Sequence, residues 1–358
     1  MFIFIFLFLF LQNNRTNLGA VVSFFKVFKQ RLNNVFFRSF FGLFFCQIFQ
    51  PKIGSHTLIF FYIWFCRLIF FCVPVVSTSL ASASKLFPNM AKNQIGWLLI
   101  DEAGQATPQS VAGLIQRSKR CVIVGDPIQV EPVVTIPKTL VDGLIKHQNI
   151  DSVWSPYNGS AQQLADRISK YGTQMGDVWT GFPLRTHRRC FNPMFDIANE
   201  IAYENQMVKG TKDKNEQEYI GESCWFDVVG NGSGDSQVIN EEIELLKEKI
   251  SGLRKTYLGD IYVISPFKAV ADKCRGALNN FENVQCGTIH TFQGKEADVV
   301  FLVLGSHPDK VGSRQWASTK PNMLNVALTR AKKRCYVIGN KELWSQQPYF
   351  SVMAETMQ

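Results

Sequence analysis

The sequence predicts an α/β fold in which helices flank parallel sheets. One indication is the apolar run over residues 98–100, which ends abruptly in the carboxylates Asp101 and Glu102. A stretch of helical composition over residues 109–115 and a second apolar run over residues 121–124 come next. Strand, helix and strand at these lengths form a βαβ unit with a parallel sheet, so both strands are expected to end at the same sheet edge. Open α/β sheets bind ligands at that edge.

Further elements are predicted on both sides of this unit. Apolar runs indicate strands at residues 75–78, 261–264, 299–304 and 335–339. Helices are expected over residues 161–169 and 239–253, and the second has apolar residues at helical spacing along one face. We interpret that apolar face as core packing.

The basic charge of the chain is concentrated at its start. The 358 residues carry a formal charge of +9, but residues 1–72 contain seven Lys/Arg, no Asp or Glu, and 20 of the 30 phenylalanines. The remainder has 31 basic and 29 acidic residues, an ordinary balance that by itself says little about nucleic acid.

The Phe-rich segment 1–72 allows three interpretations: a membrane anchor, a disordered tail, or sequence unrelated to the original protein. The apolar run over residues 1–11 is about half the ~20 residues needed to span a bilayer. The run over residues 58–76 is long enough, but Arg67 lies at its middle, where a charge is costly in lipid. The absence of acidic residues favours the third interpretation, and we do not expect membrane binding.

The nine cysteines and five histidines are scattered, and no two cysteines are spaced as Cys-x-x-Cys. This pattern indicates neither a disulfide framework nor a zinc site. It is typical of a reduced, cytoplasmic protein.

The two acidic turns resemble known motifs. Residues 101–105 (Asp-Glu-Ala-Gly-Gln) and 125–132 (Gly-Asp-Pro-Ile-Gln-Val-Glu-Pro) are similar to motifs II and III of superfamily 1 helicases, in the branch (1B) of the nonsense-mediated-decay and replication helicases. The resemblance implies RecA-like domains that bind ATP and Mg²⁺. It makes Asp101 the Mg²⁺ ligand, Glu102 the general base and Gln129 the γ-phosphate sensor. It also places three further residues in the nucleotide site: Gln105, Gly125 and Asp126.

Two arginine-bearing stretches extend the resemblance. Residues 184–190 contain three arginines ahead of a predicted helix; alone, such a cluster is more often a solvated face. The stretch is similar to motif IV, which assigns Arg189 to the γ-phosphate. Residues 325–332 (Asn-Val-Ala-Leu-Thr-Arg-Ala-Lys) resemble motif VI, which gives Arg330 the role of an arginine finger.

Polar residues crowd residues 287–298, just before a predicted strand, and resemble motif V. The resemblance places Gln293 and Gly294 at the nucleotide cleft and Glu296 on the ribose. Single-stranded DNA or RNA is the implied partner. Its contacts would come from this motif and from the end of the strand at 261–264: Thr288, His290, Ser265, Pro266 and Phe267. Phe267 offers a base-stacking face, with Lys268 beside it as a phosphate partner.

The phosphate loop of the family, Gly-x-x-x-x-Gly-Lys-Ser/Thr, does not occur in the sequence. We therefore expect weak ATP binding and slow hydrolysis, and a separate chain that supplies the loop is a candidate partner. The predicted organisation is an atypical segment (1–72), a partial first RecA-like domain (73–145), a connection (146–180), a complete second RecA-like domain (181–345) and a tail (346–358). The predicted function is that of a truncated ATP-dependent helicase. The alternatives are a non-catalytic binding module and a membrane-tethered protein.

Overall fold

The structure is a computed structural model that describes residues 5–8, 75–87, 90–212, 219, 221–230, 232 and 237–357. Most of the Phe-rich segment, including its expected apolar runs beyond residue 8, lies outside the described residues. The chain forms two compact units. The N-terminal unit comprises Met1–Asp101 and Ser110–Val122, and the C-terminal unit comprises Glu102–Gln109 and Ile123–Gln358.

The sheet of the N-terminal unit has the strand order β2-β1-β3-β4. Strand β1 (Ile5–Phe8) is antiparallel to both β2 (Val75–Thr78) and β3 (Trp97–Ile100). The predicted succession of strand, helix and strand is confirmed, because α5 (Pro108–Arg117) connects β3 to β4 (Cys121–Ile123). A parallel bridge joins Ile95 to Ser118 just ahead of these two strands. A short helix, α4 (Leu80–Leu86), follows β2.

The main sheet of the C-terminal unit has five strands, all parallel, in the order β11-β10-β12-β13-β9. Every residue of β10 (Ile261–Ser265) is buried. An interior strand of a parallel sheet is covered on both faces, which explains the apolar run over residues 261–264. The other strands are β9 (Cys224–Asp227), β11 (Val284–Thr288), β12 (Ala297–Val303) and β13 (Ala331–Gly339).

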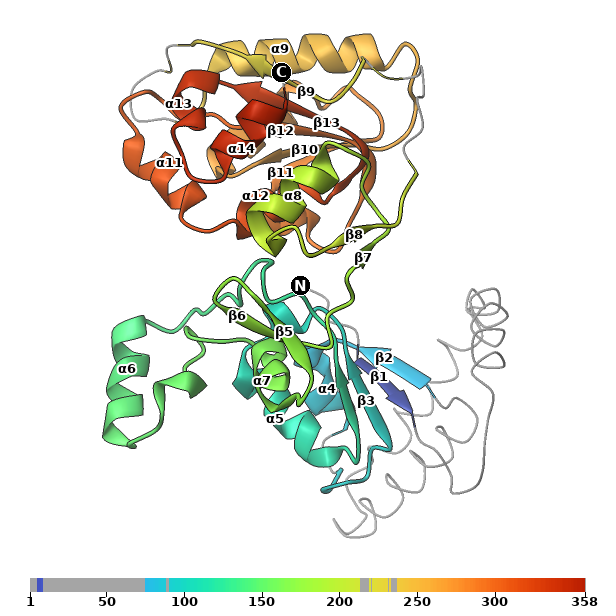
Figure 1. The fold of residues 1–358 in the computed structure, drawn as a ribbon, viewed down its shortest axis with the longest axis vertical. Coiled ribbons are helices and arrows are strands. Elements are labelled where there is room, and N and C mark those ends of the chain that lie inside the picture. The colour runs from blue at the N-terminus through green and yellow to red at the C-terminus, as the bar shows by residue number, and fades with distance from the viewer. Residues whose placement is uncertain are drawn as a thin grey trace, which may run out of the picture. The chain divides into compact units, whose positions relative to one another are not determined.

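Helices cover both faces of this sheet. Helix α9 (Asn240–Leu253) lies over one face, and α8 (Met194–Tyr203) and α12 (Asn322–Leu328) lie over the other (Figure 1). The apolar face predicted for α9 is buried, as core packing requires. The other α-helices between residues 237 and 357 are α10 (Lys268–Ala277), α11 (Val311–Ser318), α13 (Lys341–Ser345) and α14 (Phe350–Thr356).

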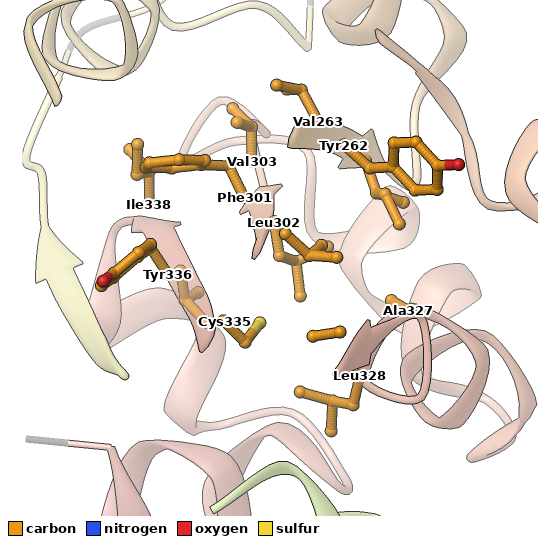
Figure 2. Packing of buried hydrophobic residues seen from close by; sticks show 14 of the residues in the cluster. Tyr262, Val263, Phe301, Leu302, Val303, Ala327, Leu328, Cys335, Tyr336 and Ile338 are labelled. Carbon is orange, nitrogen blue, oxygen red and sulfur yellow. The ribbon is translucent and has the colours of Figure 1, made fainter. Parts of the chain in front are cut away.

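The core of the C-terminal unit forms where side chains of β10, β12, β13 and α12 meet (Figure 2). Phe301 and Tyr336 pack with ring centroids 5.1 Å apart. Among the described residues, no helix has the length and apolar character required to cross a bilayer. The six cysteines of the described part carry free thiols.

The segment between the two predicted domains contains regular structure. Helix α7 (Ala161–Ile168) is confirmed and begins with a capping box between Ser160 and Gln163. A hairpin of β5 (Gly172–Met175) and β6 (Val178–Gly181) follows it and was not predicted. The other short elements are α6 (Lys138–His147), β7 (Thr186–His187), β8 (Val208–Lys209) and three 3₁₀ turns at Ala103–Gln105, Ser152–Trp154 and Ile289–Phe292.

Candidate functional site

The acidic pair follows β3 directly. Asp101 is exposed and ends the first segment of the N-terminal unit, and Glu102 begins the first segment of the C-terminal unit. Glu102 has a left-handed backbone, with φ of 56°, a conformation that non-glycine residues adopt at functional or strained positions. Gln105 Nε2 donates a hydrogen bond of 2.9 Å to Glu102 Oε2. The carboxylate of Glu102 therefore has a defined orientation.

Two glycines bring the segment after Glu102 against the turn that follows β4. The Ala103 N–H donates to the Val124 carbonyl at 2.9 Å. A Cβ atom on Gly125 would lie 2.6 Å from the Gly104 nitrogen, and one on Gly104 would lie 2.5 Å from the Asp126 carbonyl oxygen. Because real Cβ atoms do not approach so closely, both positions require glycine. The two predicted motifs therefore form one rigid backbone assembly.

Asp126 organises this turn through its carboxylate. Oδ1 accepts from the Ile128 N–H at 2.9 Å, and Oδ2 accepts from Gln129 Nε2 at 3.2 Å and from the hydroxyl of Tyr203. Asn325 Nδ2 in turn donates to the Tyr203 hydroxyl at 2.9 Å. Burial raises the pKa of Tyr203 well above its ordinary value, and the nearby Asp126 charge raises it further. The phenol therefore stays protonated and remains a donor to Asp126.

This hydrogen-bonded group links the motif III turn to α8 and α12. The Gln129 carbonyl also accepts from Asn322 Nδ2 at 2.7 Å. Asn325 lies in the stretch that resembles motif VI, although the sequence assigned it no role. Tyr203 was missed altogether, because a tyrosine at the end of a helix gives no signal in the sequence.

Arg189 and Glu296, expected on opposite parts of the nucleotide, form an ion pair. Arg189 Nε lies 2.7 Å from Glu296 Oε2, and Lys332 Nζ lies 3.0 Å from Glu296 Oε1. Burial raises the pKa of Glu296, but the hydrogen bonds from Lys332 and Arg189 outweigh it and the pKa is lowered overall. Glu296 therefore remains ionised, with each carboxylate oxygen held by a basic side chain.

Arg330 points into the protein. It is 2 % exposed, and its guanidinium donates to the carbonyls of Val326 (3.1 Å) and Lys295 (3.0 Å). Its pKa is lowered by burial and by the Arg189 charge, whereas the Glu102 charge raises it. Three residues predicted for one reaction site are thus close enough to act on one another electrostatically.

Gly294 lies beside Glu102, and Gln293 directly precedes it in the chain. Gly294 has φ of +72°, and a Cβ atom there would lie 3.8 Å from Glu102 Oε1. Within the described part of the chain, the buried amide nitrogen of Gln293 has no hydrogen-bond partner. An unpaired buried donor is costly, so a polar group from a bound molecule would be favourable here. This observation fits a nucleotide.

Metal binding rests on fewer groups. Across the described residues, no three His, Cys, Asp or Glu side chains gather as a ready-made metal site. Mg²⁺ commonly uses one or two carboxylates together with substrate phosphates and water. Asp101, exposed at the end of β3, is compatible with that mode.

Most of the residues predicted to contact nucleic acid line one groove. Its volume is about 350 Å³, and four of the five predicted residues contribute to it: Pro266, Phe267, Thr288 and His290. The fifth, Ser265, is buried, and its hydroxyl accepts from the Phe267 N–H at 3.3 Å. The groove also includes Lys268, predicted as a phosphate partner, together with Gln237, Trp316 and Met323, which the sequence did not indicate. Trp316 lies in a stretch that matched no motif.

Comparison with protein families gives two matches. A family model described as an AAA domain matches residues 179–342, and a second AAA domain model matches residues 69–136. Among solved structures, an arterivirus helicase, nonstructural protein 10, in complex with DNA aligns with a TM-score of 0.34 and 14 % identity, covering 72 % of this chain and 43 % of that chain.

Curated relatives are helicases or related proteins by name. The mouse 5'-3' DNA helicase ZGRF1 is 24 % identical over 312 residues, which are 81 % of this chain and 14 % of that protein. Regulator of nonsense transcripts 1 of Caenorhabditis elegans is 24 % identical, over 71 % of this chain and 24 % of its own length. The DNA polymerase alpha-associated DNA helicase A of Saccharomyces cerevisiae is 26 % identical, over 69 % and 38 %. The chain therefore spans well under half of each of these relatives. Together with the sequence motifs, the two domain matches and the curated relatives indicate that the chain is a superfamily 1 helicase-like protein.

Proposed function

We propose that the chain hydrolyses ATP and couples hydrolysis to translocation on, or unwinding of, DNA or RNA. The observation that carries this proposal is that Glu102, Arg189 and Arg330 gather around the same backbone segments. A Cβ atom on Gly294 would lie 3.8 Å from Glu102 Oε1, and Arg330 donates to the carbonyl of the next residue, Lys295, at 3.0 Å. Arg189 Nη1 donates to the carbonyl of Thr329, directly before Arg330, at 3.4 Å. A general base and two guanidinium groups acting at one place are what stabilisation of a phosphoryl-transfer transition state requires. The unpaired amide of Gln293 and the similarity to helicases support the same conclusion.

Each residue has a distinct role in this proposal. Glu102 polarises the attacking water, and Gln105 holds its carboxylate in place through the 2.9 Å hydrogen bond. Arg189, whose side chain is 36 % exposed, neutralises charge on the γ-phosphate, and the buried Arg330 adds positive charge from behind it. Guanidinium suits this task because it never loses its proton at ordinary pH. Gln129, oriented by Asp126, senses the γ-phosphate. Asp101 would hold Mg²⁺, which neutralises phosphate charge when bound.

The phosphate loop of the family has no counterpart in this sequence. That loop supplies backbone N–H groups and a lysine to the phosphates, and no Gly-x-x-x-x-Gly-Lys-Ser/Thr occurs in the sequence. We propose that ATP binding is weak and hydrolysis slow unless a second chain provides the loop.

The groove formed by Pro266, Phe267, Thr288 and His290 binds the single strand in this proposal. Lys268 provides a positive charge for the phosphate backbone of the nucleic acid. Helix α10 begins at the groove, and its N-cap residue makes no side-chain capping bond. Its first N–H groups are consequently suited to a phosphate oxygen, because helix N-termini favour anions.

The test is steady-state phosphate release from ATP, with Mg²⁺, for the full chain and for Glu102→Gln. We expect Glu102→Gln to remove the activity, since the amide cannot accept the proton of the attacking water. Glu248→Gln is the matched control, because Glu248 is an exposed carboxylate on α9 with its side chain 72 % accessible. Equal rates for wild type and Glu102→Gln would contradict the proposal. Binding of oligonucleotide without any hydrolysis would instead identify a non-catalytic binding protein.

A further inference from the structure

We propose that Trp316 is a base-stacking residue of the groove and that α11 holds its ring there ready for a nucleobase. This inference rests on the proposed function of the groove in binding single-stranded nucleic acid. It names a contact residue that lies outside the motifs recognised in the sequence.

The exposures of the two aromatic residues in the groove point to Trp316. Phe267, for which the sequence suggested a stacking face, is only 9 % exposed, whereas Trp316 is 57 % exposed. Both line the same groove, with ring centroids 6.3 Å apart. The larger ring therefore presents its surface to solvent, while the smaller ring supports it from the protein side. An indole of this size left in water is an apolar surface available to a ligand.

Behind Phe267, a series of aromatic rings runs into the core. Phe267 packs at 6.4 Å from the ring of Trp344, which is fully buried, and Trp344 packs at 4.7 Å from Phe350. The Trp344 indole nitrogen donates to the Gly305 carbonyl at 3.1 Å. Of these four aromatic residues, only Trp316 is exposed to solvent. Packed aromatic rings that continue into the core therefore support Trp316.

Hydrogen bonds from the side chain of Arg314, two residues before Trp316, hold helix α11 in place. Arg314 is buried and donates to the Ser306 hydroxyl (3.1 Å) and to the carbonyls of His307 and Pro308 (2.8 Å each). On the same helix, the Ser313 hydroxyl accepts from Gln237 Nε2 at 2.7 Å. These bonds fix the helix without covering the indole of Trp316. A ring that is already ordered loses little conformational freedom when a base stacks on it.

The chemistry of the groove favours a nucleotide over a purely apolar ligand. Lys268 supplies a positive charge, and Thr288 and His290 supply polar groups around the aromatic surface. A flat π surface beside a cation matches the base and the phosphate of a single strand. Because every base has a π face, Trp316 is expected to contribute equally to DNA and RNA and to different base sequences.

The experiment is fluorescence anisotropy of labelled oligo(dT) and oligo(U) with the full chain, across a series of salt concentrations. We expect Trp316→Ala to raise the Kd of both oligonucleotides roughly 5- to 150-fold, the range of one lost base stack. The salt dependence should stay unchanged, because stacking releases no counterions. By contrast, Lys268→Gln should make the negative slope of log association constant against log salt concentration shallower by roughly 0.7. This is the contribution of one phosphate contact on a single strand.

Three controls separate stacking from a loss of structure. Trp154→Ala removes another exposed tryptophan, 51 % accessible and outside the groove, and should leave the Kd unchanged. Trp316→Phe should restore most of the affinity. Wild type should bind an oligonucleotide with abasic sites less tightly than the intact oligonucleotide. Trp316→Ala should bind the abasic and the intact oligonucleotide equally tightly.

The possible failures are distinguishable. If wild type binds oligonucleotide and Trp316→Ala binds it equally well, the inference is wrong and the proposed function stands. Self-association of the chain that is lost in Trp316→Ala, with oligonucleotide binding unaltered, would assign the ring to a protein interface and would overturn the inference. If wild type binds no oligonucleotide, the proposed function of the groove fails and the inference fails with it.

Discussion

A buried carboxyl group on α9 should make the stability of the protein depend on pH. Glu242 is 1 % exposed, and its Oε2 accepts a hydrogen bond of 2.8 Å from the Gly305 N–H. Its Oε1 has no hydrogen-bond partner within the described residues. The pKa of Glu242 is raised from 4.5 to about 8, mainly by burial. The hydrogen bond from Gly305 opposes this increase, and the charge of the neighbouring Glu241 adds to it. The folded protein therefore holds a proton on Glu242 at neutral pH, whereas the unfolded chain does not.

The sign of the effect follows from proton linkage. Between pH 4.5 and about 8 the folded state binds more protons than the unfolded state, so the free energy of unfolding falls as pH rises. The slope is about 1.4 kcal/mol per pH unit, or roughly 5 kcal/mol over the whole interval. Replacement by glutamine keeps the shape and hydrogen-bonding capacity of the protonated acid but cannot ionise. Glu242→Gln should therefore gain stability relative to wild type as pH rises.

His187 produces the opposite dependence at lower pH. Burial, together with the neighbouring Arg189 charge, lowers the pKa of this imidazole from 6.5 to about 4. Its ring nitrogen Nε2 accepts from the Cys190 N–H at 2.9 Å, a bond that only the unprotonated nitrogen can accept. The unfolded chain binds the extra proton between pH 4 and 6.5, so this group makes stability rise with pH there. The decrease due to Glu242 should consequently be clearest between pH 6.5 and 8.

The assay is urea unfolding of wild type and Glu242→Gln at half-unit intervals from pH 5 to 8, followed by tryptophan fluorescence. The difference between the two proteins isolates Glu242, because all other groups titrate in both. We expect nearly equal stability at pH 5 and a growing advantage of Glu242→Gln above it. A difference that does not change with pH would show that Glu242 keeps the same protonation state across this range in the folded and unfolded protein.

Three further perturbations test the site. Gly125→Ala should destabilise the protein by about 1–3 kcal/mol in urea unfolding, because its Cβ would lie 2.6 Å from the Gly104 nitrogen; Gly143→Ala, with open space around it, should be neutral or stabilising. Tyr203→Phe should cost about 1–3 kcal/mol of unfolding free energy by removing a buried hydroxyl between two polar partners, and an unchanged urea midpoint would count against that network. Arg189→Ala should change stability by no more than about 1 kcal/mol, since the ion pair that it breaks has side chains 36 % and 43 % exposed. It should nevertheless lower phosphate release at least tenfold, and a normal rate would remove this arginine from the site.

Parts of the fold were readable because burial leaves a direct trace in the sequence. The strand Ile261–Ser265 is covered on both faces, and residues 261–264 are therefore an apolar run. The hairpin β5–β6 has no such trace, because its first strand reads Gly-Thr-Gln-Met and gains its structure from pairing with the second. The pairing of β1 with β2 and β3 was hidden in the same way, within a segment whose composition is unusual throughout.

The site was partly readable for a different reason. Side chains such as Glu102 and Arg330 belong to short motifs with a recognisable order, and the structure places them within electrostatic range. Their detailed contacts depend on tertiary packing, as the bonds from Arg330 to backbone carbonyls illustrate. The same holds for the groove, where packing buries Phe267 and exposes Trp316. No local pattern distinguishes a supporting aromatic ring from a contacting one.

The most direct test of the account is whether single-stranded nucleic acid accelerates ATP hydrolysis by the full chain. Phosphate release would be measured at fixed ATP and Mg²⁺ while oligo(dT) or oligo(U) is titrated. The account predicts a rate that rises and saturates, with Trp316→Ala requiring more oligonucleotide for the same stimulation, because the groove and the site around Glu102 act on one reaction. A rate that is the same with and without saturating oligonucleotide would contradict it.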